Sequence, residues 1–96
     1  MNVIKKKTLD GYALRHADAA MPLASWRKIF ENTDFADINA IRAVLPTADF
    51  VDPYTIFNIK GNNYRLVVAV HYDKKRMFIR FVGTHSEYNR INAETV

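Results

Sequence analysis

The second half of the chain contains three runs rich in β-branched and aromatic residues, at 54–60, 63–72 and 77–84. Short polar segments separate them, first Gly61-Asn62 and then the Asp-Lys-Lys-Arg stretch at 73–76, and both compositions are typical of turns. Consecutive strands joined by such short turns pair in antiparallel fashion. The pattern therefore predicts a three-stranded meander.

The expected register of this meander gathers polar side chains on one face. With a two-residue loop at 61–62, Lys60 lies opposite Asn63. Two positions further along each strand, Asn58 lies opposite Arg65, so all four side chains project from the same face.

The second turn is expected to extend this surface. If residues 73–76 close symmetrically, Arg65 also lies opposite Thr84, and His85 follows at the end of the strand. The register thus predicts a polar, cationic patch on an otherwise apolar sheet.

The first half of the chain has apolar residues at helical spacing. The expected elements are a short edge strand at Val3 and Ile4, a helix ending between His16 and Ala20, a second helix with Pro22 in its first turn and its end near Thr33, and a third helix capped by Asp37 and ended by Pro46.

This order of elements predicts an α+β fold in a single domain covering residues 1–96. The N-terminal helices are expected to pack on one face of an antiparallel sheet, formed by the C-terminal meander and the short N-terminal strand. The other face is then free for a ligand.

The charge is distributed unevenly between the two halves. Residues 1–52 contain seven Lys and Arg against seven acids, whereas residues 53–96 contain seven against three, so the whole net charge of +4 lies in the sheet half. A basic face attracts phosphate-rich partners, although a merely solvated surface has the same composition. The lack of Cys fits a reducing compartment. Without a signal peptide or a membrane span in the sequence, we expect a cytoplasmic protein.

Two stretches of the sheet half, FNIKGNNYRLVVAV and RFVGTHSEY, resemble the HigB branch of the RelE-like bacterial toxins. The resemblance implies a small RelE-like α+β fold and the toxin of a type II toxin-antitoxin system. It also implies an mRNA endoribonuclease acting on transcripts in the ribosomal A site, and inhibition by a HigA-like helix-turn-helix antitoxin. No cofactor or metal is expected, and no His/Asp/Glu cluster in the sequence suggests a metal site.

Cleavage of RNA without a metal requires activation of the 2′-OH, stabilisation of the phosphorane, and protonation of the leaving 5′ oxygen. Arg65 is the candidate for charge stabilisation, because its planar fork can take two phosphate oxygens, and Lys60 is a nearby point charge. His85 is the candidate general base or acid. Tyr88, one helical turn later, can share the acid role or stack on a base.

Three further residues are candidates for RNA binding. Asn58 and Asn63 can orient a phosphate or read a base edge, although asparagines at 62–63 are first of all turn formers. Arg80 is a secondary candidate, since an arginine on a sheet also snorkels or pairs with a carboxylate. His85 has a structural alternative as a helix cap.

The chain departs from the RelE pattern at two positions and from the pattern of many HigB-like sequences at a third. Asn58 stands where RelE has a strand lysine, His85 stands where an arginine falls, and Asn89 replaces an Asp that many HigB-like sequences carry. A basic-residue mechanism therefore does not transfer directly.

Two non-catalytic functions compete with the nuclease. Toxins of the ParE type share the RelE-like fold but inhibit gyrase by contact, and a general single-strand RNA-binding module also uses a basic sheet face. A ParE-type binder is distinguished from the nuclease by whether Arg65, His85 and Tyr88 surround one phosphate-sized space. A single-strand RNA-binding module is distinguished by strong, salt-sensitive affinity for free RNA, which a ribosome-dependent nuclease does not need.

Overall fold

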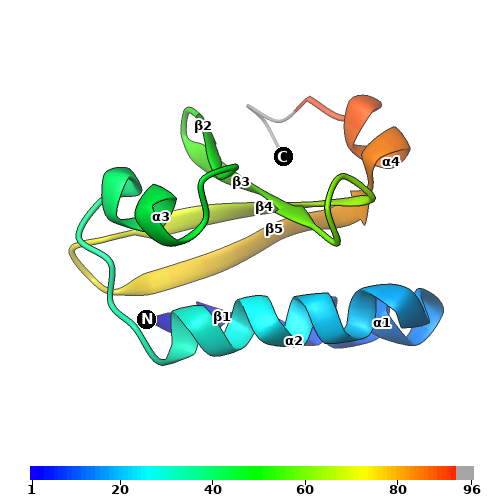
Figure 1. Ribbon diagram of the computed structural model, residues 1–96, viewed down its shortest axis with the longest axis horizontal. Helices are drawn as coiled ribbons and strands as arrows, with labels where there is room; N and C mark the ends of the chain where they lie inside the picture. Colours follow the sequence, from blue (N-terminus) through cyan, green and yellow to red (C-terminus); the bar gives the residue numbers. More distant parts are fainter. Residues whose placement is uncertain (93–96) are drawn as a thin grey trace.

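A computed structural model describes residues 1–92 of the chain (Figure 1). Five strands form one sheet in the order β1-β5-β4-β3-β2. The elements in chain order are β1 (Asn2–Ile4), α1 (Lys6–Arg15), α2 (Ala17–Glu31), α3 (Ile38–Val44), β2 (Asp49–Val51), β3 (Tyr54–Ile59), β4 (Tyr64–His71), β5 (Arg76–Thr84) and α4 (His85–Asn89).

The predicted α+β class and the meander β3-β4-β5 are confirmed. The sheet is mixed rather than wholly antiparallel, because the predicted N-terminal edge strand, β1, pairs in parallel with β5. The other edge strand, β2, was not predicted. It has three residues and pairs antiparallel with β3, and so short a run carries no readable alternation.

Helices α1 and α2 lie along one face of the sheet, below the strands in Figure 1, while β2 and α4 rise on the other side. The core fills the space between the helices and the sheet. Trp26 and Phe30 of α2 pack against Phe57 of β3, with ring centroids 5.3 and 5.2 Å from that of Phe57. The apolar positions of one sheet face are thereby used for stability.

Helix α2 begins earlier than predicted. It starts at Ala17, so Pro22 is inside the helix rather than in its first turn. There Pro22 cannot donate the hydrogen bond that would reach the carbonyl of Asp18. The turn forms nevertheless because Ala19 is completely buried in the core, and packing outweighs the local preference.

Asn58 lies opposite Arg65 in the β3–β4 pairing, as predicted. The last pair is Ile59–Tyr64, so residues 60–63 form the connecting turn instead of the predicted two-residue loop at 61–62, and Lys60 and Asn63 lie in that turn rather than opposite each other in the strands.

The β4–β5 register differs from the prediction: Arg65 lies opposite Gly83, and Thr84 lies opposite Tyr64. The connecting turn closes between His71 and Arg76, and a bulge between Val67 and Val68 then shifts the pairing by one residue. Symmetrical closure of 73–76 was therefore the wrong assumption.

Candidate RNA-binding cleft

A cleft of about 500 Å³ lies on the sheet face opposite α1 and α2. Its floor comes from β3 and β4 and one wall from α4, while the other wall comes from α3, the loop at residues 45–48 and the start of β2. The residues that line it are Arg42, Pro46, Thr47, Ala48, Asp49, Ile56, Asn58, Arg65, His85 and Tyr88. Four of the predicted site residues, Asn58, Arg65, His85 and Tyr88, are thus brought together.

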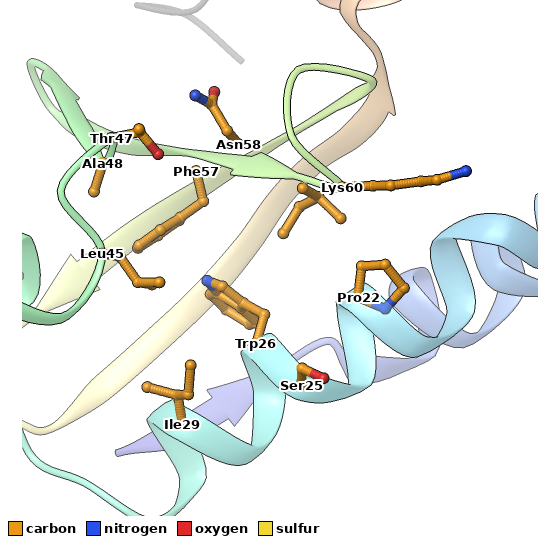
Figure 2. Close-up of a pocket in the computed structure, with 11 residues that line it drawn as sticks. Pro22, Ser25, Trp26, Ile29, Leu45, Thr47, Ala48, Phe57, Asn58 and Lys60 are labelled. Carbon is orange, nitrogen blue, oxygen red and sulfur yellow. The ribbon is translucent and has the colours of Figure 1, made fainter.

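Strand alternation places Asn58 in the cleft. Figure 2 shows Phe57 pointing toward Trp26 and the neighbouring Asn58 pointing away from it, to the other face of β3. Asn58 lies opposite Arg65 on β4, so the amide and the guanidinium share the cleft floor.

Arg65 is half-buried and has few partners. Its Nη1 lies 3.5 Å from the carbonyl oxygen of Tyr64, and within residues 1–92 no carboxylate forms an ion pair with it. Because this guanidinium has no carboxylate partner, its N–H groups are available to bind two phosphate oxygens at once.

Helix α4 presents His85 and Tyr88, and its start is closely fixed. Thr84 is the N-cap: its Oγ1 accepts from the N–H of Glu87 at 3.1 Å, and Glu87 Oε1 accepts from the N–H of Thr84 at 2.7 Å. The backbone N–H of His85 also donates to the carbonyl of Asn63 at 3.1 Å. Since Thr84 performs the capping, the exposed imidazole of His85 is not required as a cap.

Glu87 connects this cap to α1. Tyr12 donates its hydroxyl proton to Glu87 Oε1 at 3.2 Å. The backbone hydrogen bond from Thr84, with a further contribution from Tyr12, lowers the pKa of Glu87 below its ordinary value. The pKa of Tyr12 is raised, mainly by burial and then by its hydrogen bond to Glu87. Both shifts favour the form in which Glu87 is ionised and Tyr12 is protonated.

Lys60 does not share the surface that the register predicted. Its backbone has a left-handed φ of 53°, which takes it out of the strand alternation. Its Nζ donates to Asp18 of α2 at 2.9 Å, and Asp18 also accepts from the hydroxyl of Tyr64 at 2.6 Å. These two donors, Tyr64 foremost, lower the pKa of Asp18. The ammonium is therefore paired on the helix side of the sheet, outside the cleft.

Asn63 and Arg80 also lie outside the cleft lining. The Asn63 side chain is exposed in the β3–β4 turn, and the residue contributes its carbonyl to His85. Arg80 lies at the bulge of β5, between the pairs Val68–Ile79 and Val67–Phe81. Its guanidinium carbon lies 5.9 Å from the ring centroid of Tyr54.

The cleft contains two charged residues that sequence reasoning did not select, Arg42 and Asp49. Arg42 Nε donates to the carbonyl of Ala48 at 2.9 Å, and its Nη2 lies 3.4 Å from Asp49 Oδ1. Both residues come from the half of the chain with balanced charge, and no motif marked them.

A second, smaller cavity of about 140 Å³ lies on the helix side of the sheet (Figure 2). Trp26, Ile29, Leu45 and Phe57 give it an apolar interior, and neither Arg65 nor His85 reaches it. Asn58 and Lys60 also line it, but the Lys60 ammonium is paired with Asp18, so the cavity offers no unpaired cation to a phosphate from the residues that line it.

In the described part of the chain, no group of three or more His, Cys, Asp or Glu side chains is arranged to hold a metal ion. None of the helices in residues 1–92 has the length and apolar character needed to cross a membrane.

Comparison with known proteins gives a consistent result. Residues 19–91 match the HigB toxin family, described as the RelE-like toxic component of a toxin-antitoxin system. The mRNA interferase toxin HigB of Escherichia coli K12 is 28% identical over 96 residues, covering 97% of this chain and 92% of the relative. The mRNA interferase HigB of E. coli O6:H1 is 24% identical over 94 residues, covering 95% and 91%.

Fold, cleft and comparisons together define a RelE-like toxic component of a toxin-antitoxin system. Within that class, the chain belongs to the HigB toxin family, since the family match covers more than half of its length.

Proposed function

We propose that this protein is an endoribonuclease that cleaves mRNA on the ribosome, by attack of the 2′-OH and without a metal ion. The observation that carries the proposal is the convergence of Arg65, His85 and Tyr88 on one cleft. The relatives named mRNA interferases support the same activity. A HigA-like helix-turn-helix antitoxin is the expected partner, and the cytoplasm, where ribosomes and mRNA are found, is the expected location.

In the proposed reaction a general base takes the proton of the 2′-OH, whose oxygen forms a bond to phosphorus. The bond from phosphorus to the 5′ oxygen breaks, and a general acid gives that oxygen a proton. Arg65 stabilises the charge of the phosphorane, while His85 and Tyr88 supply proton transfer. The products are a 2′,3′-cyclic phosphate and a 5′-hydroxyl.

The geometry favours an enzyme over a toxin that acts by contact. A contact inhibitor does not need an arginine free of carboxylates, an imidazole and a phenol around the same cleft. A module that binds free single-stranded RNA needs a continuous basic surface. The ion pair between Lys60 and Asp18 argues against this function, because it neutralises one of the cations of the predicted basic face.

The reaction is tested with mRNA on purified ribosomes. A message with a 2′-O-methyl group at the cleaved nucleotide should remain intact, whereas the unmodified message is cut to a cyclic phosphate and a 5′-hydroxyl. Cleavage of the methylated message, or a 5′-phosphate on the product, would contradict attack by the 2′-OH.

His85→Gln keeps a polar side chain of similar size but removes the acid or base. Cleavage should fall by about a hundredfold or more. His71→Gln is the matched control, because His71 is exposed at the end of β4 and does not line the cleft. Equal rates for wild type and His85→Gln would remove His85 from the chemistry.

A further inference from the structure

The wall of the cleft formed by α3 and β2 has no part in the chemistry assigned to Arg65 and His85, yet it contains an acid. Asp49 is the one carboxylate among the described residues that line the cleft, and its side chain is 66% exposed. A carboxylate repels phosphate, so its presence beside an RNA backbone is unfavourable unless it meets a different chemical group.

Two contacts within the protein orient the Asp49 carboxylate. Its Oδ1 accepts from the N–H of Phe50 at 2.9 Å and lies 3.4 Å from Arg42 Nη2. Arg42 is itself held through the carbonyl of Ala48. Both contacts within the described chain use Oδ1, which leaves Oδ2 as an acceptor without a donor from residues 1–92.

Only some groups of RNA can satisfy such an acceptor. Phosphate oxygens and base carbonyls are repelled, whereas the ribose 2′-hydroxyl and the amino groups of adenine, cytosine and guanine donate to carboxylates; of these donors only the amino groups depend on the base. Uracil has a single N–H between two carbonyl oxygens and is the poorest match. In single-stranded RNA these base edges are exposed and can be read.

We propose that Asp49, oriented by Arg42, reads the base of a nucleotide beside the cleaved phosphate and favours bases with an amino group over uracil. This inference rests on the proposed nuclease function. The cleft has room for a base as well as a phosphate group, and the Asp49 wall stands across the floor from the wall that holds His85 and Tyr88.

The test uses four ribosome-bound messages that differ only in one base of the A-site codon, with each codon position examined in turn. Wild type should cut the messages with adenine, cytosine or guanine at one position about tenfold faster than the message with uracil. Single-turnover rates measure this ratio without a contribution from product release.

Asp49→Asn replaces the anionic acceptor by an amide that both donates and accepts. The rate ratio between amino-bearing bases and uracil should fall toward one, while the variant still cuts the uracil message. Asp73→Asn is the matched control, since it makes the same charge change in the exposed β4–β5 turn. It should keep the wild-type ratio.

Failure of this inference and failure of the proposed function give different results. If wild type cuts and Asp49→Asn has the same base preference, Asp49 does not read a base. If Asp49→Asn slows all four messages equally, Asp49 contacts the ribose or supports the wall, and the inference is also wrong. If wild type cuts none of the messages, the nuclease function itself is rejected.

Discussion

Arg65 and Lys60 are five positions apart in the sequence, and the structure gives them opposite environments. Lys60 is paired with Asp18, whereas Arg65 faces the cleft with no carboxylate partner among residues 1–92. A cation already paired in the folded protein must break that pair before it binds a phosphate. Arg65 therefore has the advantage as the residue that stabilises negative charge on the substrate.

Arg65→Ala should reduce cleavage by about a hundredfold, corresponding to roughly 3 kcal/mol of lost phosphorane stabilisation. Arg65→Lys should recover little of it, because an ammonium cannot reproduce the planar fork. Rates on ribosome-bound mRNA measure the effect, and urea unfolding shows whether the fold is kept.

Arg76→Ala is the matched control, as Arg76 is exposed and does not line the cleft. A well-folded Arg65→Ala variant that cuts at the wild-type rate would exclude Arg65 from the mechanism.

Sequence reasoning placed Asn58 and Arg65 correctly because strand alternation and one hairpin register determine both positions. Lys60 was misplaced because its left-handed backbone, followed by that of Gly61, ends the strand alternation. Arg42 and Asp49 were missed for a different reason. They reach the cleft from α3 and β2, a contact distant in sequence that no local pattern predicts.

At the scale of elements, α4 is the part of the site that depends most on its surroundings. It has five residues, far fewer than an isolated helix needs to be stable in water. Its position is set by the Thr84 cap, by the Asn63 carbonyl and by the hydrogen bond from Tyr12 to Glu87. The placement of His85 thus depends on α1.

Glu87→Gln should make the protein less stable at pH 7 by roughly 0.5 kcal/mol, a small value because Glu87 is exposed to solvent. The folded-state pKa of Glu87 is lowered, so the contribution of the ionised carboxylate to stability is fully present above the ordinary Glu pKa of about 4.5. That contribution is lost as the pH falls through the lower, folded-state value.

Urea unfolding between pH 7 and pH 2 measures the difference between wild type and variant, which should shrink at acid pH. Asp73→Asn, in an exposed turn, provides the comparison for an acid outside the cap. A difference for Glu87→Gln that stays constant down to pH 2 would show that the charge of Glu87 does not stabilise the cap.

Elements with strong periodicity or clear caps were predictable. Asp37 caps α3 as expected, its Oδ1 accepting from the N–H of Ala40 at 2.9 Å. The strands of the meander are separated by turns close to the two predicted polar segments. The start of α2 and the strand β2 were not predictable. Both depend on packing or pairing with distant parts of the chain, which outweighs local preference at Pro22 and across residues 49–51.

At the scale of the whole molecule, production of this chain alone in bacteria should stop growth and shorten transcripts, because an mRNA-cleaving toxin removes the templates of translation. Co-production of the HigA-like antitoxin should relieve the arrest. Growth curves and transcript lengths measure both effects. Arg65→Ala at equal protein level is the control, and unchanged growth with intact transcripts under the wild-type chain would contradict the enzyme.

The two faces of the sheet have separate tasks, with the core against α1 and α2 on one and the cleft on the other. This separation has a genetic consequence. Under the proposed function, one substitution on the cleft face is expected to give a harmless version of this protein without producing an unfolded chain that proteases must clear. Loss of toxicity and loss of the protein are then independent evolutionary events, and inactive copies can persist as folded molecules.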